Sequence, residues 1–246
     1  MKIRTRPVAS ARFATRVVPA GDSAQMLELA DEIDLEDNAR ARRIADSIRA
    51  APLEGVTDVI AAIATVTVHF EAADAAQAAA RREAISFMLL EALQDAAKPL
   101  DESVRAPVEI PACYEGSLAP DMSDVAAATG LSPEEIVQRH VASDHRVLMI
   151  GFTPGFPYIG GLDPRLNVPR RATPRARLPA GSIAIANGQT AIYPSATPGG
   201  WHLIGRTPLR LFDPLRQPPS LLQSGDRVVF VPISAAEFAR RAGSVA

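Results

Sequence analysis

Apolar and polar positions in the first part of the chain follow the periods of short strands and helices. Residues 13–30 alternate on either side of the turn Pro19-Ala20-Gly21-Asp22, which predicts two short strands. Residues 35–51 and the alanine-rich segment 75–97 show helical spacing, and residues 65–70 alternate strictly, as in a strand with one buried face. The apolar positions that set the helical period are Ala41, Ile44, Ala45 and Ile48 in the first helix and Ile85, Met88, Leu89 and Leu93 in the second. Together these elements predict a small α+β domain.

A different pattern begins after residues 98–107, a stretch that mixes Pro, Asp, Glu, Ser and Arg without periodicity. We therefore predict two domains, over residues 1–97 and 98–246. In the second domain, Ser132-Pro133-Glu134-Glu135 is a capping box with proline at the first helical position, so a short helix begins there. A buried strand is expected over 146–152.

Glycine and proline dominate the middle of the second domain. Between Gly151 and Pro219 lie nine of the 15 glycines and 12 of the 21 prolines, and they separate short apolar segments such as 182–186 and 226–231. Many short strands with such corners are typical of a closed or nearly closed β-barrel. A helix over 235–242 is expected to end the chain. The predicted fold class is α+β, with a small N-terminal α+β domain followed by a β-barrel domain.

Composition excludes several classes of function. Lys plus Arg is 26 and Asp plus Glu is 28, so the net charge of -2 does not indicate a nucleic-acid or acidic-membrane partner. The single cysteine, Cys113, excludes an internal disulfide and a multi-cysteine zinc site, and no two histidines have the spacing of a helical metal pair, so we expect no metal site. Only Lys2 and Lys98 are lysines, which argues against a P-loop or a Schiff-base enzyme.

The location of the protein follows from similar arguments. The apolar run Val59 to Phe70 has twelve residues, too few for the roughly 20 that cross a bilayer. The basic N-terminus lacks the apolar segment of a secretory signal. We therefore expect a cytoplasmic protein.

One segment, residues 165–216, holds eight arginines against one acid, Asp213. Glycines 151, 155, 160, 161, 199 and 200 lie near it in the chain and would allow the backbone to approach a ligand closely. Guanidinium groups together with backbone N–H groups suit a carboxylate, a phosphate or a developing oxyanion. The alternative is that the glycines only turn the corners of the barrel and the arginines only coat its surface.

Other side chains are candidates for chemistry or for packing. His140, near the end of the capped helix, could act as a general acid or base, or it could be a helix-terminal histidine stabilised by the dipole. Cys113 could be a nucleophile only with a paired histidine, and otherwise is a small buried residue. Phe156, Tyr193 and Trp201 could cover a ligand or fill the barrel.

Three strings of sequence resemble the KipI family, also called allophanate hydrolase subunit 1, which includes the B subunit of bacterial ATP-dependent 5-oxoprolinase. They are GFTPGFPYIGGLDPRL (Gly151 to Leu166), PRRATPRARLPAGSIAIANGQTAIYP (Pro169 to Pro194) and TPGGWHLIGRTPLRLFDP (Thr197 to Pro214). The resemblance extends more weakly toward the N-terminus. The chain differs from the family pattern at Tyr114-Glu115-Gly116-Ser117, where the family has Tyr-Gly-Gly-Glu, and at Ala119-Pro120-Asp121, where it has Gly-Pro-Asp.

The resemblance implies that the barrel is cyclophilin-like and that the chain works with other subunits. Family members act with a KipA-like (PxpC-type) subunit, and the oxoprolinase also uses a LamB/YcsF-type (PxpA) subunit. Together they open 5-oxoproline to L-glutamate with hydrolysis of ATP. The family also offers two alternatives: KipI-like inhibition of a sensor histidine kinase, without turnover, and an accessory role of the urea-carboxylase or allophanate type.

On the interpretation as an oxoprolinase subunit, the arginines and glycines form the site. We expect Arg171, Arg175 and Arg206 to hold the substrate carboxylate or a transferred phosphoryl group, and His140 to handle a proton. Because the chain has no nucleotide-binding lysine motif, we expect the ATP site to be shared with partner subunits. The remaining candidates for contact with the substrate are Gly155, Phe156, Gln189, Tyr193, Gly199, Gly200 and Trp201.

Overall fold

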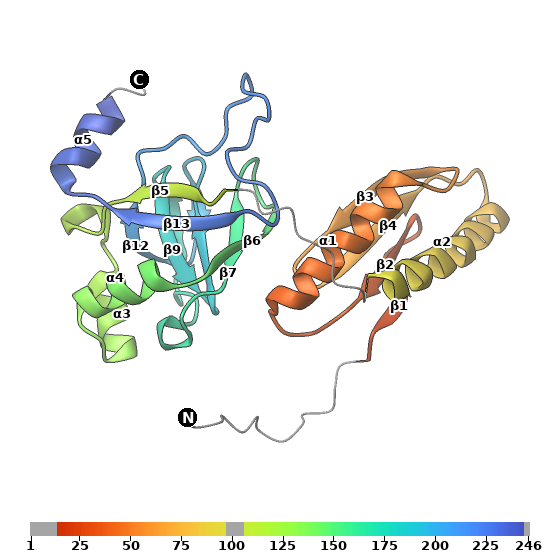
Figure 1. The fold of residues 1–246 in the computed structure, drawn as a ribbon, viewed down its shortest axis with the longest axis horizontal. Coiled ribbons are helices and arrows are strands. Elements are labelled where there is room, and N and C mark those ends of the chain that lie inside the picture. The colour runs from red at the N-terminus through yellow and green to blue at the C-terminus, as the bar shows by residue number, and fades with distance from the viewer. Residues whose placement is uncertain (1–13, 97–105, 244–246) are drawn as a thin grey trace. The chain divides into compact units, whose positions relative to one another are not determined.

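The computed structural model describes residues 14–96 and 106–243 of the chain. The chain divides into two compact units, Met1–Leu100 and Asp101–Ala246. The boundary expected between residues 97 and 98 lies outside the described residues, as do Lys2 and Lys98. Figure 1 shows that both units combine helices and strands, so the predicted α+β class is confirmed.

The N-terminal unit is a four-stranded antiparallel sheet with two helices on one face. The strands, in their order across the sheet, are β1 (Arg16–Pro19), β2 (Ala24–Glu28), β4 (Thr65–Phe70) and β3 (Val56–Ala61). Val66, Val68 and Phe70 point into the core, while Thr65, Thr67 and His69 on the other face are only partly buried. The strict alternation over residues 65–70 therefore gives the strand that was predicted from it.

The two helices are α1 (Leu35–Ala50) and α2 (Ala75–Asp95). Each begins at an aspartate: the carboxylate of Asp34 accepts hydrogen bonds from the amides of Glu36 and Asp37, and Asp74 accepts one from the amide of Gln77. All four apolar positions predicted for α1 are buried, as are Ile85 and Leu89 of α2, whereas Met88 and Leu93 lie at the edge of the same core.

The second unit is built on a seven-stranded sheet with strand order β12-β9-β10-β7-β6-β13-β5. The two edge strands are joined by a bridge between Cys113 and Arg206, whose backbone N–H and C=O groups exchange two hydrogen bonds, so the sheet is nearly closed. Cys113 is completely buried in this bridge. The strands are β5 (Val108–Ala112), β6 (His145–Ile150), β7 (Pro157–Gly160), β9 (Ser182–Ala186), β10 (Gln189–Ile192), β12 (His202–Arg206) and β13 (Arg227–Pro232).

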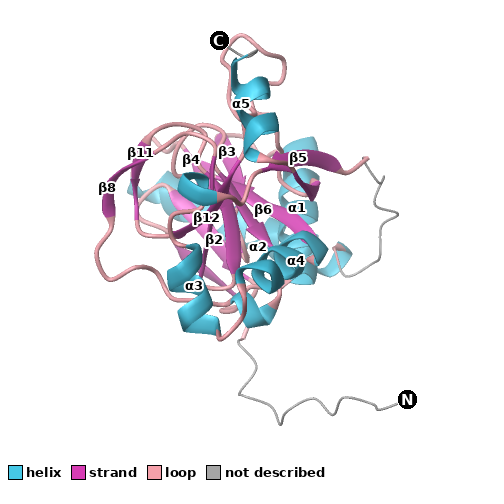
Figure 2. Cartoon of the chain, turned by 90° about the vertical axis from the view of Figure 1, so that its left-hand side faces the viewer, coloured by secondary structure: helices cyan, strands magenta, loops and turns pink. Residues whose placement is uncertain are grey.

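Helices and a small ribbon surround this barrel. The helix α4 (Pro133–Ala142) begins with the predicted capping box of Ser132 and Glu135, and α3 (Met122–Thr129), which was not predicted, precedes it. The helix α5 (Ala235–Gly243) ends the described chain. Figure 2 shows the strands β8 (Arg175–Leu178) and β11 (Thr197–Gly199) paired as a two-stranded ribbon at the side of the barrel.

The barrel unit has two apolar clusters on opposite faces of its strands. In β10, Thr190 and Ile192 point toward the main core, whereas Gln189, Ala191 and Tyr193 alternate to the outer face. The outer cluster also contains Leu178 of the ribbon, together with Phe156 and Trp201. The ribbon therefore covers an aromatic cluster on the outside of the barrel.

Candidate functional site

Asp121 connects the ribbon to the barrel. It lies just before α3 with only 1% of its surface exposed. Its carboxylate accepts hydrogen bonds from Arg175 at 2.6 and 2.7 Å, from Arg171 at 2.8 Å and from the amide of Leu203 at 2.8 Å. Burial raises the pKa of Asp121, but the hydrogen bonds and charges of these groups outweigh it and hold the pKa below its usual value. Asp121 is therefore a charged residue that fixes both arginines.

This contact changes the expected role of two arginines. Arg171 and Arg175 were expected to hold the substrate carboxylate or a phosphoryl group. In the structure their guanidinium groups are bonded to Asp121, and Arg171 also contacts Asp124 at 3.0 Å. Their positive charge is thus largely matched within the chain, and their position ties the ribbon down.

Aromatic side chains form the centre of the site. The rings of Phe156 and Tyr193 meet edge to face with centroids 5.1 Å apart, and Phe156 also contacts Phe152 at 5.4 Å and Tyr158 at 5.0 Å. Tyr158 lies 6.2 Å from Trp201. Phe152 is 64% exposed, although it is large and apolar. Its backbone φ is +62°, a strained value for a residue with a side chain, and such strain is concentrated at functional positions.

A cation and a glycine complete this aromatic surface. The guanidinium of Arg170 lies 5.9 Å from the centre of the Trp201 ring. A Cβ atom added at Gly199 would lie 2.4 Å from the Tyr193 hydroxyl oxygen, so only glycine allows the ribbon to lie this close to the tyrosine. Burial raises the pKa of Tyr193 to about 12, and therefore this hydroxyl stays protonated at neutral pH.

Some buried polar side-chain atoms of the barrel unit have no hydrogen-bond partner within the described chain. Among the described residues, Nε2 of Gln189 and the hydroxyls of Thr153 and Thr197 are buried and have no hydrogen-bond partner. Gln189 is only 6% exposed and extends from the same face of β10 as Tyr193. An unpartnered buried donor costs about 1–3 kcal/mol, so such groups need an explanation, and a bound ligand or water is the usual one.

Not all predicted site residues lie together. The structure gathers Phe156, Gln189, Tyr193 and Trp201 on the outer face of the barrel and the glycines 199 and 200 beside them, where the Gly200 carbonyl accepts a hydrogen bond from the amide of Arg171. Gly155 lies in the turn before β7, facing Phe212. Two predicted residues, His140 and Arg206, lie elsewhere.

His140 belongs to the barrel core. It is completely buried, its ring nitrogens contact the Tyr114 hydroxyl at 3.0 Å and the Thr190 hydroxyl at 3.2 Å, and Phe230 packs on its ring. Burial and the neighbouring His145 hold the pKa of His140 well below its usual value. A neutral imidazole bonded on both sides and closed off from solvent packs and orients its neighbours; this position does not give it access to a substrate.

Arg206 lies at the other end of β12, in a separate hollow of about 420 Å³. Its Nε atom donates a hydrogen bond to the carbonyl of Ala180, and its guanidinium lies 5.8 Å from the ring of Phe238 in α5. The hollow is lined also by Thr207 and Arg210. Arg206 is thus open to a ligand in this hollow, which Phe156, Tyr193 and Trp201 do not line.

Sequence reasoning missed Asp121 and Thr153 as site residues. Asp121 appeared only as the third residue of the Ala119-Pro120-Asp121 string, and its partners lie 50 and 54 positions further along the chain. The excess of arginine over acid within 165–216 was the available signal, because partly buried guanidinium groups are stabilised by a carboxylate, which here has to come from outside that segment.

The described part of the chain shows neither a metal cluster nor a membrane-spanning helix. Residues 14–96 and 106–243 contain no group of three or more His, Cys, Asp or Glu side chains that could hold a metal ion. Among the helices that the structure describes, none combines the length and apolar character needed to cross a bilayer.

Comparison with known proteins places these features in a family. Residues 15–222 match the model of the carboxyltransferase domain, subdomain C and D. The chain is 40% identical over 223 residues to a protein of Bacillus subtilis (strain 168) that is named as the B subunit of 5-oxoprolinase, and the match covers 89% of this chain and 92% of that protein.

Solved structures show the same fold. The crystal structure of TTHA0988 matches with a TM-score of 0.69 and 35% identity over 85% of this chain, and this chain spans only 40% of that longer chain. The urea carboxylase of Kluyveromyces lactis matches 95% of this chain with a TM-score of 0.73, and the match covers 23% of that protein. Because the sequence identity is only 18%, this match supports the fold alone.

Proposed function

This chain belongs to the family defined by the carboxyltransferase domain, subdomain C and D, and from that premise we propose that it is the B subunit of an ATP-dependent 5-oxoprolinase. The reaction would open the lactam of 5-oxoproline to give L-glutamate. The observation that carries the proposal is the 40% identity to a 5-oxoprolinase B subunit over about nine tenths of both chains. Such coverage includes both units, so the relation is not confined to the barrel.

The geometry supports a small-molecule site at the aromatic cluster. Phe156, Tyr193 and Trp201 provide a buried apolar wall, while Gln189 and Thr153 bring hydrogen-bonding groups with no partner in the described chain. Most ligand sites combine such a wall with a few polar groups that fix orientation. We propose that these groups contact the lactam substrate, with Gly199 and Gly200 holding the ribbon in place beside it.

The proposal assigns a positioning role to the arginine pair. Arg171 and Arg175 hold the ribbon through Asp121 and so fix the wall of the site, rather than binding the substrate carboxylate directly. Arg206, which lines its own hollow, keeps the proposed role of a contact to an anion at that place.

ATP would supply the activation that a resonance-stabilised amide needs, by making its carbonyl carbon more reactive. Arg171 and Arg175 are not suited to hold a nucleoside triphosphate, because their guanidinium groups are already bonded to the carboxylate of Asp121. We propose that ATP binds mainly on partner subunits, a KipA-like (PxpC-type) and a LamB/YcsF-type (PxpA) subunit, in a cytoplasmic hetero-oligomer.

Reconstitution tests the proposal. The chain is co-expressed with a KipA-like and a LamB/YcsF-type subunit, the complex is purified through a tag on this chain, and L-glutamate release from 5-oxoproline is measured with and without ATP. The expected result is co-purification of the partner subunits and ATP-dependent release of glutamate. An assembled complex that releases no glutamate from 5-oxoproline would rule out the proposed substrate.

A further inference from the structure

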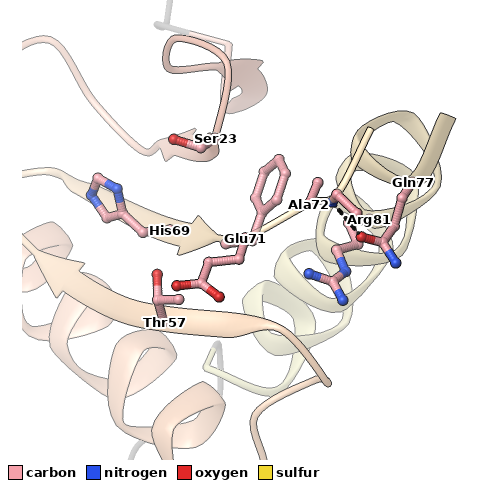
Figure 3. A pocket seen from close by; sticks show the side chains of 9 residues that line it. Ser23, Thr57, His69, Glu71, Ala72, Gln77 and Arg81 are labelled. Carbon is pink, nitrogen blue, oxygen red and sulfur yellow. Dashed lines mark hydrogen bonds between the residues drawn. The ribbon is translucent and has the colours of Figure 1, made fainter. Parts of the chain in front are cut away.

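A second hollow, of about 720 Å³, is lined by residues of the N-terminal unit (Figure 3). Its volume falls within the range of about 300–1,000 Å³ typical of small-molecule sites. The polar side chains that line it are Ser23, Thr57, His69, Glu71, Gln77 and Arg81. They come from the end of β4, the neighbouring β3, the start of β2 and the first turns of α2. None of them belongs to the aromatic site of the barrel.

Gly55 contacts the backbone of Glu71 and the guanidinium of Arg81, two of the residues that line this hollow. The amide of Glu71 donates a hydrogen bond of 2.9 Å to the carbonyl of Gly55. A Cβ atom added at Gly55 would lie 2.1 Å from Nη1 of Arg81, so the guanidinium lies directly against the glycine backbone. Gly55 has a φ of +82°, which favours glycine independently. A carboxylate-bearing and a guanidinium-bearing residue therefore both contact the same glycine.

These two charged side chains are nevertheless unpaired. Among the residues that the structure describes, neither the carboxylate of Glu71 nor the guanidinium of Arg81 has an ion pair or a hydrogen bond. The neighbouring Arg82 differs, because its guanidinium donates to the carbonyl of Asp22. In Figure 3 the Glu71 carboxylate points toward Thr57, while the Arg81 side chain extends from α2.

We propose that this hollow binds a free α-amino acid as its zwitterion. A ligand carboxylate would accept hydrogen bonds from Arg81, and its ammonium group would donate to Glu71. A zwitterionic ligand would make both contacts and a ligand with a single charge only one of them, so the pair favours a molecule that carries both charges. The hydroxyl of Thr57, which has no hydrogen-bond partner within the described chain, offers a further polar contact.

The choice of amino acid rests on the proposed function. In 5-oxoproline the nitrogen is acylated and carries no positive charge, whereas in L-glutamate, after ring opening, it is an ammonium group. The hollow would therefore bind the product of the reaction and not its substrate. This makes it a product-sensing site, distinct from the aromatic site at which we place the lactam.

Calorimetric titration of the full-length chain, without partner subunits or ATP, tests the proposal. The probes are L-glutamate, glutarate, which has both carboxylates but no ammonium group, and 5-oxoproline. We expect L-glutamate to bind at least about tenfold more tightly than either other probe. Glu71→Gln should reduce the affinity for L-glutamate to that for glutarate, whereas Arg81→Gln should weaken both. Glu83→Gln, at an exposed position of α2 outside the hollow, is the matched control and should change nothing.

Two outcomes would overturn the proposal. Equal affinities for glutarate and L-glutamate would mean an anion site, and the absence of L-glutamate binding by the folded chain would mean that the hollow is no amino-acid site. Neither outcome depends on turnover, because no partner or ATP is present. Failure of the product site is therefore distinguishable from failure of the proposed oxoprolinase activity.

Discussion

At the scale of single residues, Asp121 links three parts of the barrel unit: the start of α3, the ribbon and β12. Its carboxylate is buried, while the side chains of Arg171 and Arg175 are 26% and 32% exposed. The charge of Asp121 is stabilised by both arginines and by the amide of Leu203. Its position before α3 does not cap the helix; the side chain serves tertiary contacts instead.

We predict that Asp121→Asn lowers the free energy of unfolding by about 2–3 kcal/mol, less than for a fully buried pair because both arginines reach solvent. The lowered pKa makes this contribution complete above about pH 4, and it is lost as the pH falls through the folded-state pKa. Urea denaturation of the wild type and of Asp121→Asn at several pH values measures this difference in the free energy of unfolding. Asp124→Asn, at an exposed position, should cost no more than about 0.5 kcal/mol. A cost for Asp121→Asn that persists unchanged at the lowest pH would contradict the account.

Substitution of Gln189 should lower the rate of glutamate release without lowering the free energy of unfolding. Because its Nε2 atom is buried without a partner, we predict that Gln189→Leu leaves the free energy of unfolding unchanged or raises it by about 1 kcal/mol, while glutamate release by the complex falls. Thr190→Val is the matched comparison, because the Thr190 hydroxyl contacts His140 in the core. Thr190→Val should lower the free energy of unfolding by about 1 kcal/mol and leave the rate of glutamate release unchanged. Destabilisation by Gln189→Leu together with a normal rate would show that Gln189 is structural.

At the scale of elements, those with a local signal were predicted and those that depend on distant partners were not. The helices α1, α2 and α4 have caps and apolar periods within their own residues, and β4 alternates strictly. In contrast, α3 and the ribbon strand β11 are short, and their placement depends on contacts far along the chain. Secondary structure with so few residues carries too little periodicity to be recognised alone.

The capping box of α4 gives a prediction at this scale. The Ser132 hydroxyl accepts a hydrogen bond from the amide of Glu135, and the Glu135 carboxylate accepts one from the amide of Ser132. Ser132→Ala should lower the free energy of unfolding by about 1 kcal/mol, measured by urea denaturation. Ser195→Ala, at an exposed position, should stay within about 0.5 kcal/mol of the wild type. Equal effects of the two changes would show that the cap contributes nothing.

At the scale of the whole molecule, charge and composition located the site only in part. The arginine-rich segment 165–216 does contribute to the candidate site, but two of its eight arginines, Arg171 and Arg175, are bonded to Asp121, which lies outside the segment. Counting charges along the chain cannot show which guanidinium groups a carboxylate occupies. The aromatic residues Phe156, Tyr193 and Trp201 were predicted individually, while their gathering on the outer face of the barrel depends on strand register.

The rate of glutamate release as a function of the concentration of this chain tests the central claim most directly. A fixed amount of the KipA-like and LamB/YcsF-type subunits is supplied with 5-oxoproline and ATP, and the chain is titrated into the mixture. A component of the enzyme should raise the rate from background to a plateau at a fixed ratio to its partners. A rate that stays the same from zero chain to excess would contradict the account.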